Sequence, residues 1–520
     1  MSSNNNYTLY CASIISLGGF LFGFDASVIS GVVPFVSQEF GLSDWQLGWV
    51  VSSPTLGGVV AALSMGPLSD LFGRKKVILV IAFLYLLSAV VSALAPDFQT
   101  LAVARFIGGL AFGSLFIAPI YIAEISPPKL RGRFVSINQM NIVVGFSAAY
   151  FANYFLLNLS ESGTPWVTSL GIDSNTWRWM LGLEILPATL FFLSLLTIPE
   201  SPRWLVTKNR IEEAKATLLK LAPEGDADAT IASVQETLAG DRQPPLAKRI
   251  ASLFDPSLRR ILTIGLIVGI IQQVTGVNAI YFYAPSIFEQ SGAGTNAAFA
   301  QAIWVGIINV IFTIVAMALI DRLGRRLLML VGLGGVLVSL SLAAYGFYSA
   351  RYTLDDTDAQ ELAELIEPET LSPLIGKVYD NDLAFKAALA DALGDEAASA
   401  HESALIQAAI QANAILILVG ILGFVASFAI SLGPVMWVLL SEIFPNRIRG
   451  IAISFIGIFN SGASFLVQFV FPWELSNLGS AMTFAIYGLF AVIGMILLIR
   501  LLPETKGKSL EQLEAELVKA

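Results

Sequence analysis

Residues 66–76 read Gly-Pro-Leu-Ser-Asp-Leu-Phe-Gly-Arg-Lys-Lys, and residues 321–326 read Asp-Arg-Leu-Gly-Arg-Arg. Each stretch places an acid, a glycine and adjacent basic residues directly after a long apolar run. A charged motif that recurs once in each half of an apolar chain indicates a duplicated unit. A duplicated bundle of helices in lipid is typical of a transporter.

The composition indicates a membrane protein. The 520 residues are 55% hydrophobic and 13% charged, and their mean hydropathy is +0.72, which excludes an ordinary soluble domain. A spanning helix needs about 20 mostly apolar residues. Twelve such runs lie near residues 9–36, 46–68, 77–95, 99–122, 134–157, 177–198, 259–287, 298–320, 327–349, 412–440, 451–472 and 479–502. Backbone groups in lipid must bond within the protein, so we predict an all-α fold of two pseudo-symmetric six-helix bundles.

The motifs and the longer loops divide the chain into domains. We predict an N-terminal six-helix bundle at 1–198, a cytoplasmic helical linker at 199–257 and a C-terminal six-helix bundle at 258–520. The linker is well charged and contains two amphipathic stretches, 211–221 and 229–238. Such stretches predict short helices that lie under the bundles.

The second half also contains an insertion. Asp70 and Glu124 are 54 residues apart, whereas their counterparts Asp321 and Glu442 are 121 residues apart. The excess falls in an acidic extracytoplasmic segment, 351–411, which holds thirteen acids and three basic residues in a chain of net charge −9. This segment is either a solvated decoration or a cap that binds a partner or attracts cations. Short helices are predicted within it at 355–367 and 381–399.

Lysine and arginine are concentrated in alternate loops. The loops after the second, fourth and sixth spans are basic, whereas the short loops at 37–44, 158–175, 288–297 and 473–478 contain no lysine or arginine. By the positive-inside rule the basic loops and both termini should be cytoplasmic. The first residues have no basic n-region or cleavage site, so the first span should be retained. We expect a multi-pass protein of the cell membrane, and the short tails favour a bacterial inner membrane.

Cysteine and histidine are too scarce to support metal or redox chemistry. Cys11 is the only cysteine, so no intramolecular disulfide can form, and its place in the first span predicts a buried apolar role. His401 is the only histidine and lies in the acidic insertion, where we expect it to be solvated. We therefore expect no metal and no cofactor apart from a coupling proton.

Three ionisable residues lie inside spans of the first half, namely Asp25, Arg105 and Glu184. Each costs roughly 2.5–3.5 kcal/mol on insertion scales, so each needs a partner or a function. Counted along their helices, all three lie roughly 10–16 Å below the outer face. Arg105 can neutralise only one carboxylate, which predicts a proton-coupling site with Asp25 as the titrating group and Glu184 as the supporting acid. The alternative is a static ion pair that only holds three helices together.

Several further motifs carry a resemblance to a known family. They are Gly-Arg-Lys at 73–75 and Gly-Arg-Arg at 324–326, Glu124 to Arg131 and Glu442 to Arg449, Pro-Glu-Ser-Pro-Arg at 199–203, Gln272-Gln273 with Gly276 and Asn278, and Pro-Glu-Thr at 503–505. With these motifs the chain resembles the sugar porters of the major facilitator superfamily, apart from 351–411. The resemblance implies a substrate path between the two bundles that opens to each side in turn.

The resemblance also implies a set of sugar-binding residues. The matching positions are Gln139, Gln272, Gln273, Asn278, Asn309, Trp437 and Asn460. Amides donate to and accept from sugar hydroxyls, and an indole covers the apolar face of a sugar ring. For any one amide, a hydrogen bond between helices is the alternative role. The chain departs from the family pattern at Phe146, Phe282, Leu432 and Ser461, which reshapes the predicted pocket and leaves the sugar unnamed.

The same resemblance implies a gate of charged residues on the cytoplasmic side. Its salt bridges would hold the outward-open state, and its members match Arg74, Glu124, Arg131, Glu200, Arg203, Arg325, Glu442, Arg449 and Glu504. Arginine in these loops also sets the topology. The alternative for any single member is therefore that it only obeys the positive-inside rule.

Asp25, Arg105 and Glu184 match the proton-coupled members of the family, whereas uniporting relatives typically have asparagine at the position of Asp25. We therefore expect a secondary transporter that imports a small neutral monosaccharide or polyol with a proton, working as a monomer in a lipid bilayer and binding no nucleic acid. Two alternatives stay open, a facilitative uniporter on the same scaffold and a sugar receptor that does not transport. The sequence brings together no nucleophile and base that would indicate an enzyme.

Overall fold

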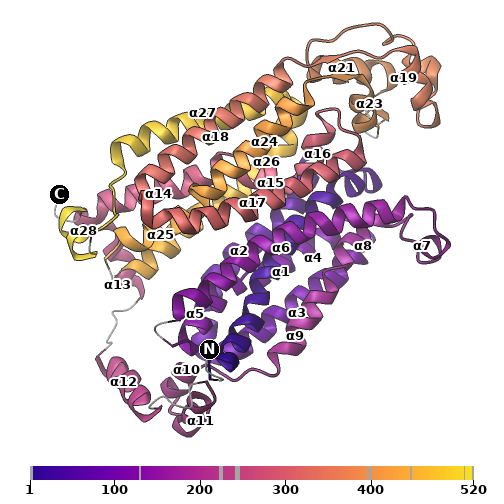
Figure 1. The fold of residues 1–520 in the computed structure, drawn as a ribbon. Helices are drawn as coiled ribbons and strands as arrows, with labels where there is room; N and C mark the ends of the chain where they lie inside the picture. Colours follow the sequence, from indigo (N-terminus) through magenta and orange to yellow (C-terminus); the bar gives the residue numbers. More distant parts are fainter. Residues whose placement is uncertain are drawn as a thin grey trace. The chain divides into compact units, whose positions relative to one another are not determined.

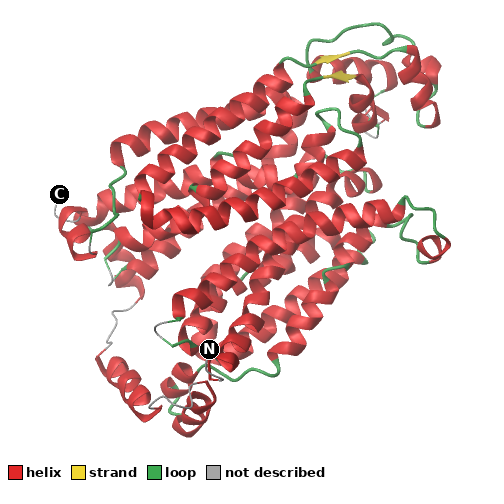
Figure 2. Cartoon of the chain, viewed as in Figure 1, coloured by secondary structure: helices red, strands yellow, loops and turns green. Residues whose placement is uncertain are grey.

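The computed structural model describes residues 4–127, 130–221, 227–240, 246–394, 397–398, 401–445, 448–508 and 510–517. These residues are helical almost throughout (Figure 2), and the sheet that they contain has two short strands. Twelve segments are long and apolar enough to cross a membrane. The predicted all-α fold with twelve spans is confirmed.

The first six spans follow the predicted apolar runs, but two of them are broken. The unbroken spans are α1 (Asn4–Glu39), α2 (Asp44–Phe72), α3 (Arg74–Ala93) and α6 (Arg131–Ser160). The fourth span consists of α4 (Phe98–Ala111) and α5 (Ser114–Ile125), and the sixth of α8 (Thr176–Gly182) and α9 (Ile185–Leu195), with the short α7 (Pro165–Ser169) before it. The start of α4 is fixed by Asp97, whose side chain accepts a hydrogen bond from the backbone N–H of Thr100.

Short helices form the segment between the sixth and seventh spans. They are α10 (Pro202–Thr207), α11 (Ile211–Leu221), α12 (Ala227–Gly240), α13 (Leu246–Ala251), η1 (Ser252–Phe254) and η2 (Pro256–Leu258). Ser201 begins α10, because its side chain accepts a hydrogen bond from the backbone N–H of Trp204. The two helices predicted from amphipathic stretches lie in α11 and α12.

The seventh span differs from the single run expected at 259–287. It consists of α14 (Arg259–Val274), α15 (Val277–Phe282) and α16 (Ala284–Glu289). Gly276, with φ +88°, separates the first two pieces, and Tyr283, with φ −122° and ψ 17°, separates the last two. The remaining spans are α17 (Thr295–Leu323), α18 (Arg325–Tyr348), the pair α24 (Ala414–Ile430) and α25 (Leu432–Ile443), α26 (Arg449–Asn477) and α27 (Gly479–Leu501), followed by α28 (Leu510–Leu517).

The insertion at 351–411 is a folded body with its own core, and in Figure 1 it lies beyond the end of α18 and the start of α24. Its elements are β1 (Arg351–Tyr352), α19 (Asp356–Glu361), η3 (Leu362–Glu364), α20 (Pro368–Leu371), α21 (Asp382–Leu393), α23 (Glu402–Ala409) and β2 (Ile410–Gln411). The strands pair antiparallel, with Arg351 opposite Gln411. The helix predicted at 381–399 ends at Leu393, and residues 395–396 and 399–400 lie outside the described part. His401 is half-buried at the start of α23.

Contacts divide the chain into two compact units. Unit 1 contains 1–28, 53–149 and 178–254, and unit 2 contains 29–52, 150–177 and 255–520. In unit 1 a large apolar core surrounds Cys11, which is fully buried as predicted. In unit 2 the segments from the first half pack directly on the later helices. The Tyr150 hydroxyl donates to the carbonyl of Tyr281 at 2.6 Å.

Helices α1 and α6 cross very closely within unit 1. A Cβ atom built on Gly23 would lie 2.0 Å from the carbonyl oxygen of Ile142, and one built on Gly145 would lie 2.1 Å from that of Phe20. Only glycine permits such an approach of two backbones in a membrane bundle. This crossing lies two residues from Asp25 and so fixes the depth of that carboxyl group.

Candidate functional site

Asp25, Arg105 and Glu184 lie together in the interior of unit 1. Each is at most 2% exposed. Arg105 Nη1 forms an ion pair with Asp25 Oδ1, and its Nη2 donates to the Asp25 backbone oxygen at 3.1 Å. Glu184 lies beside both residues, at the break between α8 and α9. Three different spans therefore meet at this buried charged group.

The acids of this group outnumber its cation. Asp25 Oδ2, Glu184 Oε1 and Arg105 Nε have no hydrogen-bond partner among the described residues, although all three atoms are buried. Buried polar atoms of this kind are normally satisfied by protein or by water. One guanidinium carries a single positive charge and cannot neutralise two carboxylates. The group can therefore become electrically neutral by binding one proton.

Four of the expected sugar-binding residues form a hydrogen-bonded chain in unit 2. Asn278 Nδ2 donates to Gln273 Oε1 at 3.0 Å, and Gln273 Nε2 donates to Gln272 Oε1 at 3.2 Å and to Asn460 Oδ1 at 3.3 Å. Asn460 Nδ2 donates to Gln272 Oε1 at 2.7 Å. The chain ends at Leu432, whose carbonyl accepts from Gln272 Nε2 at 2.9 Å. The amides are thus held in fixed orientations.

Two residues that the sequence analysis missed extend this chain. Ser464 Oγ accepts from Asn278 Nδ2 at 2.6 Å and from Gln468 Nε2 at 2.7 Å. The Tyr283 hydroxyl in turn donates to the backbone oxygen of Gln468 at 3.2 Å. Asn460, Ser464 and Gln468 are spaced four residues apart, so they share one face of α26. Polar residues at this spacing within an apolar run could have indicated these two residues from the sequence alone.

The other three expected sugar-binding residues make no hydrogen bond with these four amides in the described part of the protein. Asn309 is half-buried in α17, and Trp437 is 43% exposed in α25. Gln139 is exposed in α6 and belongs to unit 1. Two of the positions that depart from the family pattern have structural roles instead. Leu432 supplies the carbonyl named above, and the Phe146 ring packs edge-on against Phe22 in unit 1.

The repeated charged motif has the same geometry in both units. In unit 1, Arg74 pairs with Glu124 at 3.1 Å and with Asp70 at 2.9 Å. The Glu200 carboxylate accepts from the backbone N–H of Lys75 at 3.0 Å, and a Cβ on Gly73 would lie 2.4 Å from Glu200 Oε2. Burial raises the pKa of Glu200, and the hydrogen bonds from backbone N–H groups oppose that rise.

In unit 2, Arg325 pairs with Glu442 at 2.7 Å and with Asp321 at 3.0 Å. Glu504 accepts from the backbone N–H of Arg325 at 3.1 Å, and a Cβ on Gly324 would lie 2.7 Å from Glu504 Oε2. Both glycines have positive φ, +105° for Gly73 and +91° for Gly324. A glycine is therefore needed at each start of helix, both for its backbone angle and for the approach of the glutamate.

Five of the nine expected gate residues make no ion pair among the described residues. Glu200 and Glu504 accept from backbone N–H groups instead, as described above, and the other three are arginines. Arg131 Nε donates to the carbonyl of Ala123 at 3.0 Å, and Arg449 Nε to that of Phe444 at 3.2 Å. Arg203 is exposed. Arg131 thus bonds the last turn of α5, and Arg449 bonds the residue that directly follows α25.

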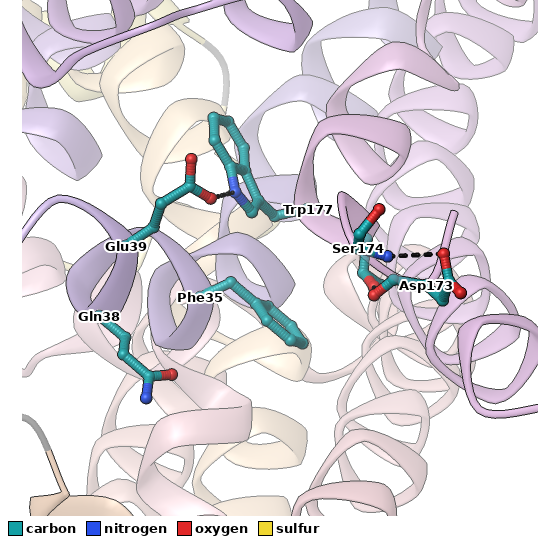
Figure 3. Close-up of a pocket in the computed structure, with 7 residues that line it drawn as sticks. Phe35, Gln38, Glu39, Asp173, Ser174 and Trp177 are labelled. Carbon is teal, nitrogen blue, oxygen red and sulfur yellow. Dashed lines mark hydrogen bonds between the residues drawn. The ribbon is translucent and has the colours of Figure 1, made fainter. Parts of the chain in front are cut away.

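A separate polar cavity lies where α1 ends and α8 begins (Figure 3). Trp177 Nε1 donates to Glu39 Oε2, and the backbone N–H of Ser174 donates to Asp173 Oδ1 at 2.8 Å. Phe35 and Gln38 complete the part of the wall drawn with labels. The first of these bonds ties the start of α8 to the end of α1, and the second lies within the loop before α8. Neither in this cavity nor in the rest of the described residues is a cluster of three or more His, Cys, Asp or Glu placed to hold a metal ion.

Comparison with known proteins identifies the family. The family described as "Sugar (and other) transporter" matches residues 11–357 and 398–517, which omits 358–397 inside the insertion. The chain belongs to this family, the sugar porters of the major facilitator superfamily. It is therefore a multi-pass membrane transporter and not an enzyme.

Relatives of known activity and structure cover nearly the whole chain. The arabinose-proton symporter of Bacillus subtilis (strain 168) is 34% identical over 515 residues, which are 99% of this chain and 96% of the relative. The D-xylose-proton symporter of Escherichia coli (strain K12) is 30% identical over 545 residues, with 98% and 96% covered. The inward-open structure of the xylose transporter XylE from E. coli superimposes with a TM-score of 0.75 at 29% identity, covering 98% of this chain and all of that one.

Proposed function

We propose that this protein imports a monosaccharide or closely related polyol together with a proton, by alternating access. The observation that carries the proposal is the buried group of two acids and one arginine in unit 1. Two carboxylates and one guanidinium carry a net negative charge, and one proton bound by the group, which we assign to Asp25, removes that charge from the interior. Binding and release of the proton can therefore be linked to the state of the surrounding helices. The names of the arabinose and xylose relatives support proton coupling.

The amide chain of unit 2 supports a neutral, hydroxyl-rich substrate. Its side chains are uncharged, and each amide can donate to one hydroxyl while accepting from another. We assign Gln272, Gln273, Asn278 and Asn460 to the sugar site, and Gln139, Asn309 and Trp437 to the same site by their family positions. The sugar itself is to be found by uptake of a panel of labelled pentoses, hexoses and polyols.

The charged clusters around Arg74 and Arg325 are proposed as the two halves of a cytoplasmic gate. We place both termini in the cytoplasm of a bacterial cell and the insertion outside the inner membrane, on the distribution of lysine and arginine. A single protomer is proposed as the working unit. Labelling of single cysteines introduced at Asp380 and Lys248 from each side of the membrane tests the orientation, because Cys11 is buried.

The test of proton coupling uses Asp25→Asn in proteoliposomes. We expect the variant to lose accumulation driven by an inward proton gradient and to keep counterflow exchange of labelled sugar, because the amide cannot carry the proton. Asp173→Asn makes the same chemical change at an exposed residue and should keep both activities. If Asp25→Asn still concentrates sugar, the protein is coupled elsewhere or is a uniporter, and the assignment of Asp25 is wrong.

A further inference from the structure

The insertion is joined to the helices of unit 2 by more than its two connections. Its core includes the stacked rings of Tyr352 and Phe385, whose centroids are 5.6 Å apart. The strands β1 and β2 pair directly after α18 and directly before α24, which closes the body at its base. Because its ends are paired and it has its own core, the insertion can act as one unit on the helices that its surface contacts.

One contact is with the start of α27. The Asp382 carboxylate is only 8% exposed as a residue, and its Oδ2 accepts from the backbone N–H of Ser480 at 2.9 Å. Gly479 has φ +77°, and a Cβ atom there would lie 2.5 Å from Asp382 Oδ1. A hydrogen bond to an ionised carboxylate is among the stronger kinds in proteins. The approach of Asp382 therefore depends on the glycine beside it.

A second set of contacts reaches the end of α16. Ser403 Oγ donates to Glu289 Oε2 at 3.3 Å, and a Cβ on Gly292 would lie 2.8 Å from Ile410 Cγ2. Ser480 Oγ also donates to Gln290 Oε1 at 2.7 Å. Ser480 is thus held by the insertion through its backbone and by the α16 end through its side chain.

The end of α16 is the far end of the broken seventh span. The middle piece, α15, carries Asn278 of the amide chain, and it is separated from its neighbours by the non-helical residues Gly276 and Tyr283. Such breaks are where transporter helices bend around a binding site. A restraint on α16 therefore acts on the segment that holds Asn278.

We propose that the insertion is a clasp that holds the end of α16 to the start of α27 and so restrains the α15–α16 segment during the transport cycle. Asp382, Ser403 and Ile410 are its contact residues. The clasp is not a sugar site, so loosening it changes the rate of the cycle and leaves the preference among sugars unaltered. The proposal requires transport but not proton coupling.

The surroundings of Glu289 make the contact sensitive to external pH. Glu289 is 4% exposed, and burial raises its pKa to about 7 against hydrogen bonds from Thr295 and Ser403. Of the charged residues of the insertion, Glu402 adjoins Ser403 in the sequence and pairs with Lys386 at 2.7 Å. The clasp itself rests on the contact geometry of Asp382, Ser403 and Ile410 described above, and not on this pKa.

The first test measures hydrogen exchange in the full-length protein. Asp382→Ala should raise exchange about tenfold in peptides covering 284–292 and 479–483, as expected for the loss of a hydrogen bond to a charged group. The control, Asp380→Ala, changes an exposed acid of the same insertion that pairs with Arg351 at 3.2 Å, and it should leave both peptides unchanged. Equal exchange at 284–292 in the two variants would overturn the proposal.

The second test does not depend on transport being coupled to protons. Cysteines introduced at Gln290 and Ser480 are joined by a short, reducible bis-thiosulfonate. The reagent does not reach Cys11, because that side chain is fully buried. We expect the joined protein to lose sugar counterflow and to regain it on reduction. The covalent link makes the restraint on α16 permanent. Unimpaired counterflow in the joined protein would therefore show that a restraint at this position does not affect the transport cycle, which would overturn the proposal. A protein that never transports before joining contradicts the proposed function instead.

Discussion

Gly145→Ala should separate α1 from α6 and disturb the buried charged group. The new Cβ atom would lie 2.1 Å from the carbonyl oxygen of Phe20, whereas ordinary contact begins near 3.4 Å. The helices must therefore move apart by roughly 1.3 Å, because neither contacting atom belongs to a flexible side chain. Asp25 lies five residues after Phe20 on the same helix, so its ion pair with Arg105 is displaced by a similar amount.

The expected loss of stability follows from two opposing effects. Overpacking in a close-packed interior typically costs about 1–3 kcal/mol, and a backbone contact belongs to the upper part of that range. Replacing glycine by alanine in a helix gives back about 0.8–1 kcal/mol. We therefore expect Gly145→Ala to lower the free energy of unfolding by about 2 kcal/mol and to weaken proton-driven accumulation more than counterflow.

Gly132→Ala is the matched control on the same helix. A Cβ atom at Gly132 meets nothing within 4 Å, so that variant should be neutral or slightly more stable. Unfolding of the purified proteins in mixed micelles gives the stability, and uptake into proteoliposomes gives the activity. If the two variants are equally stable and equally active, the close crossing of α1 and α6 is not what positions Asp25.

Two further predictions concern unit 2. Asn460→Leu removes the hydrogen bonds with Gly269, Gln272 and Gln273 and a long one to Met436 Sδ. At about 0.6 kcal/mol for each of the first three bonds between membrane helices, it should lower the free energy of unfolding by roughly 2 kcal/mol; a variant as stable as Ser461→Ala would contradict the hydrogen-bonded amides. For Glu289, whose pKa is raised from 4.5 to about 7 by burial, the docked insertion is most stable at low pH and loses that stability as the pH rises through about 7. The protection factor at 284–292, which is the intrinsic exchange rate at each pH divided by the observed rate, should therefore fall between about pH 4.5 and pH 7 in the native protein. Glu289→Gln should abolish this fall, and a native protection factor that does not change with pH would show that this carboxyl does not control the contact.

Sequence reasoning placed the spans well because apolar length alone decides where a chain crosses lipid. It missed the breaks at Gly276 and Tyr283, since an interruption of one or two residues leaves the surrounding hydropathy almost unchanged. The breaks depend on tertiary contacts. A Cβ on Gly276 would lie 2.4 Å from the ring of Tyr487, which is more than 200 residues away in the sequence.

The meeting of Asp25, Arg105 and Glu184 could be expected from their common depth, because an unpaired charge in lipid is too costly to persist. The partners of Asn278 were harder to foresee. Ser464 and Gln468 are ordinary polar residues in a long helix, and only the facing positions on α15 and α26 make them part of the amide chain. The tie between Asp382 and Ser480 had no sequence signal, since an acid among thirteen in the insertion does not stand out.

The paired glycine and glutamate at the two charged clusters have a practical consequence. Because Gly73 with Glu200 and Gly324 with Glu504 share one local geometry, each substitution in one has an internal replicate in the other. A replacement that harms only one copy reports on the surroundings of that copy, and one that harms both reports on the turn itself. The two clusters can therefore be compared as equivalent sites within a single polypeptide and at identical concentration.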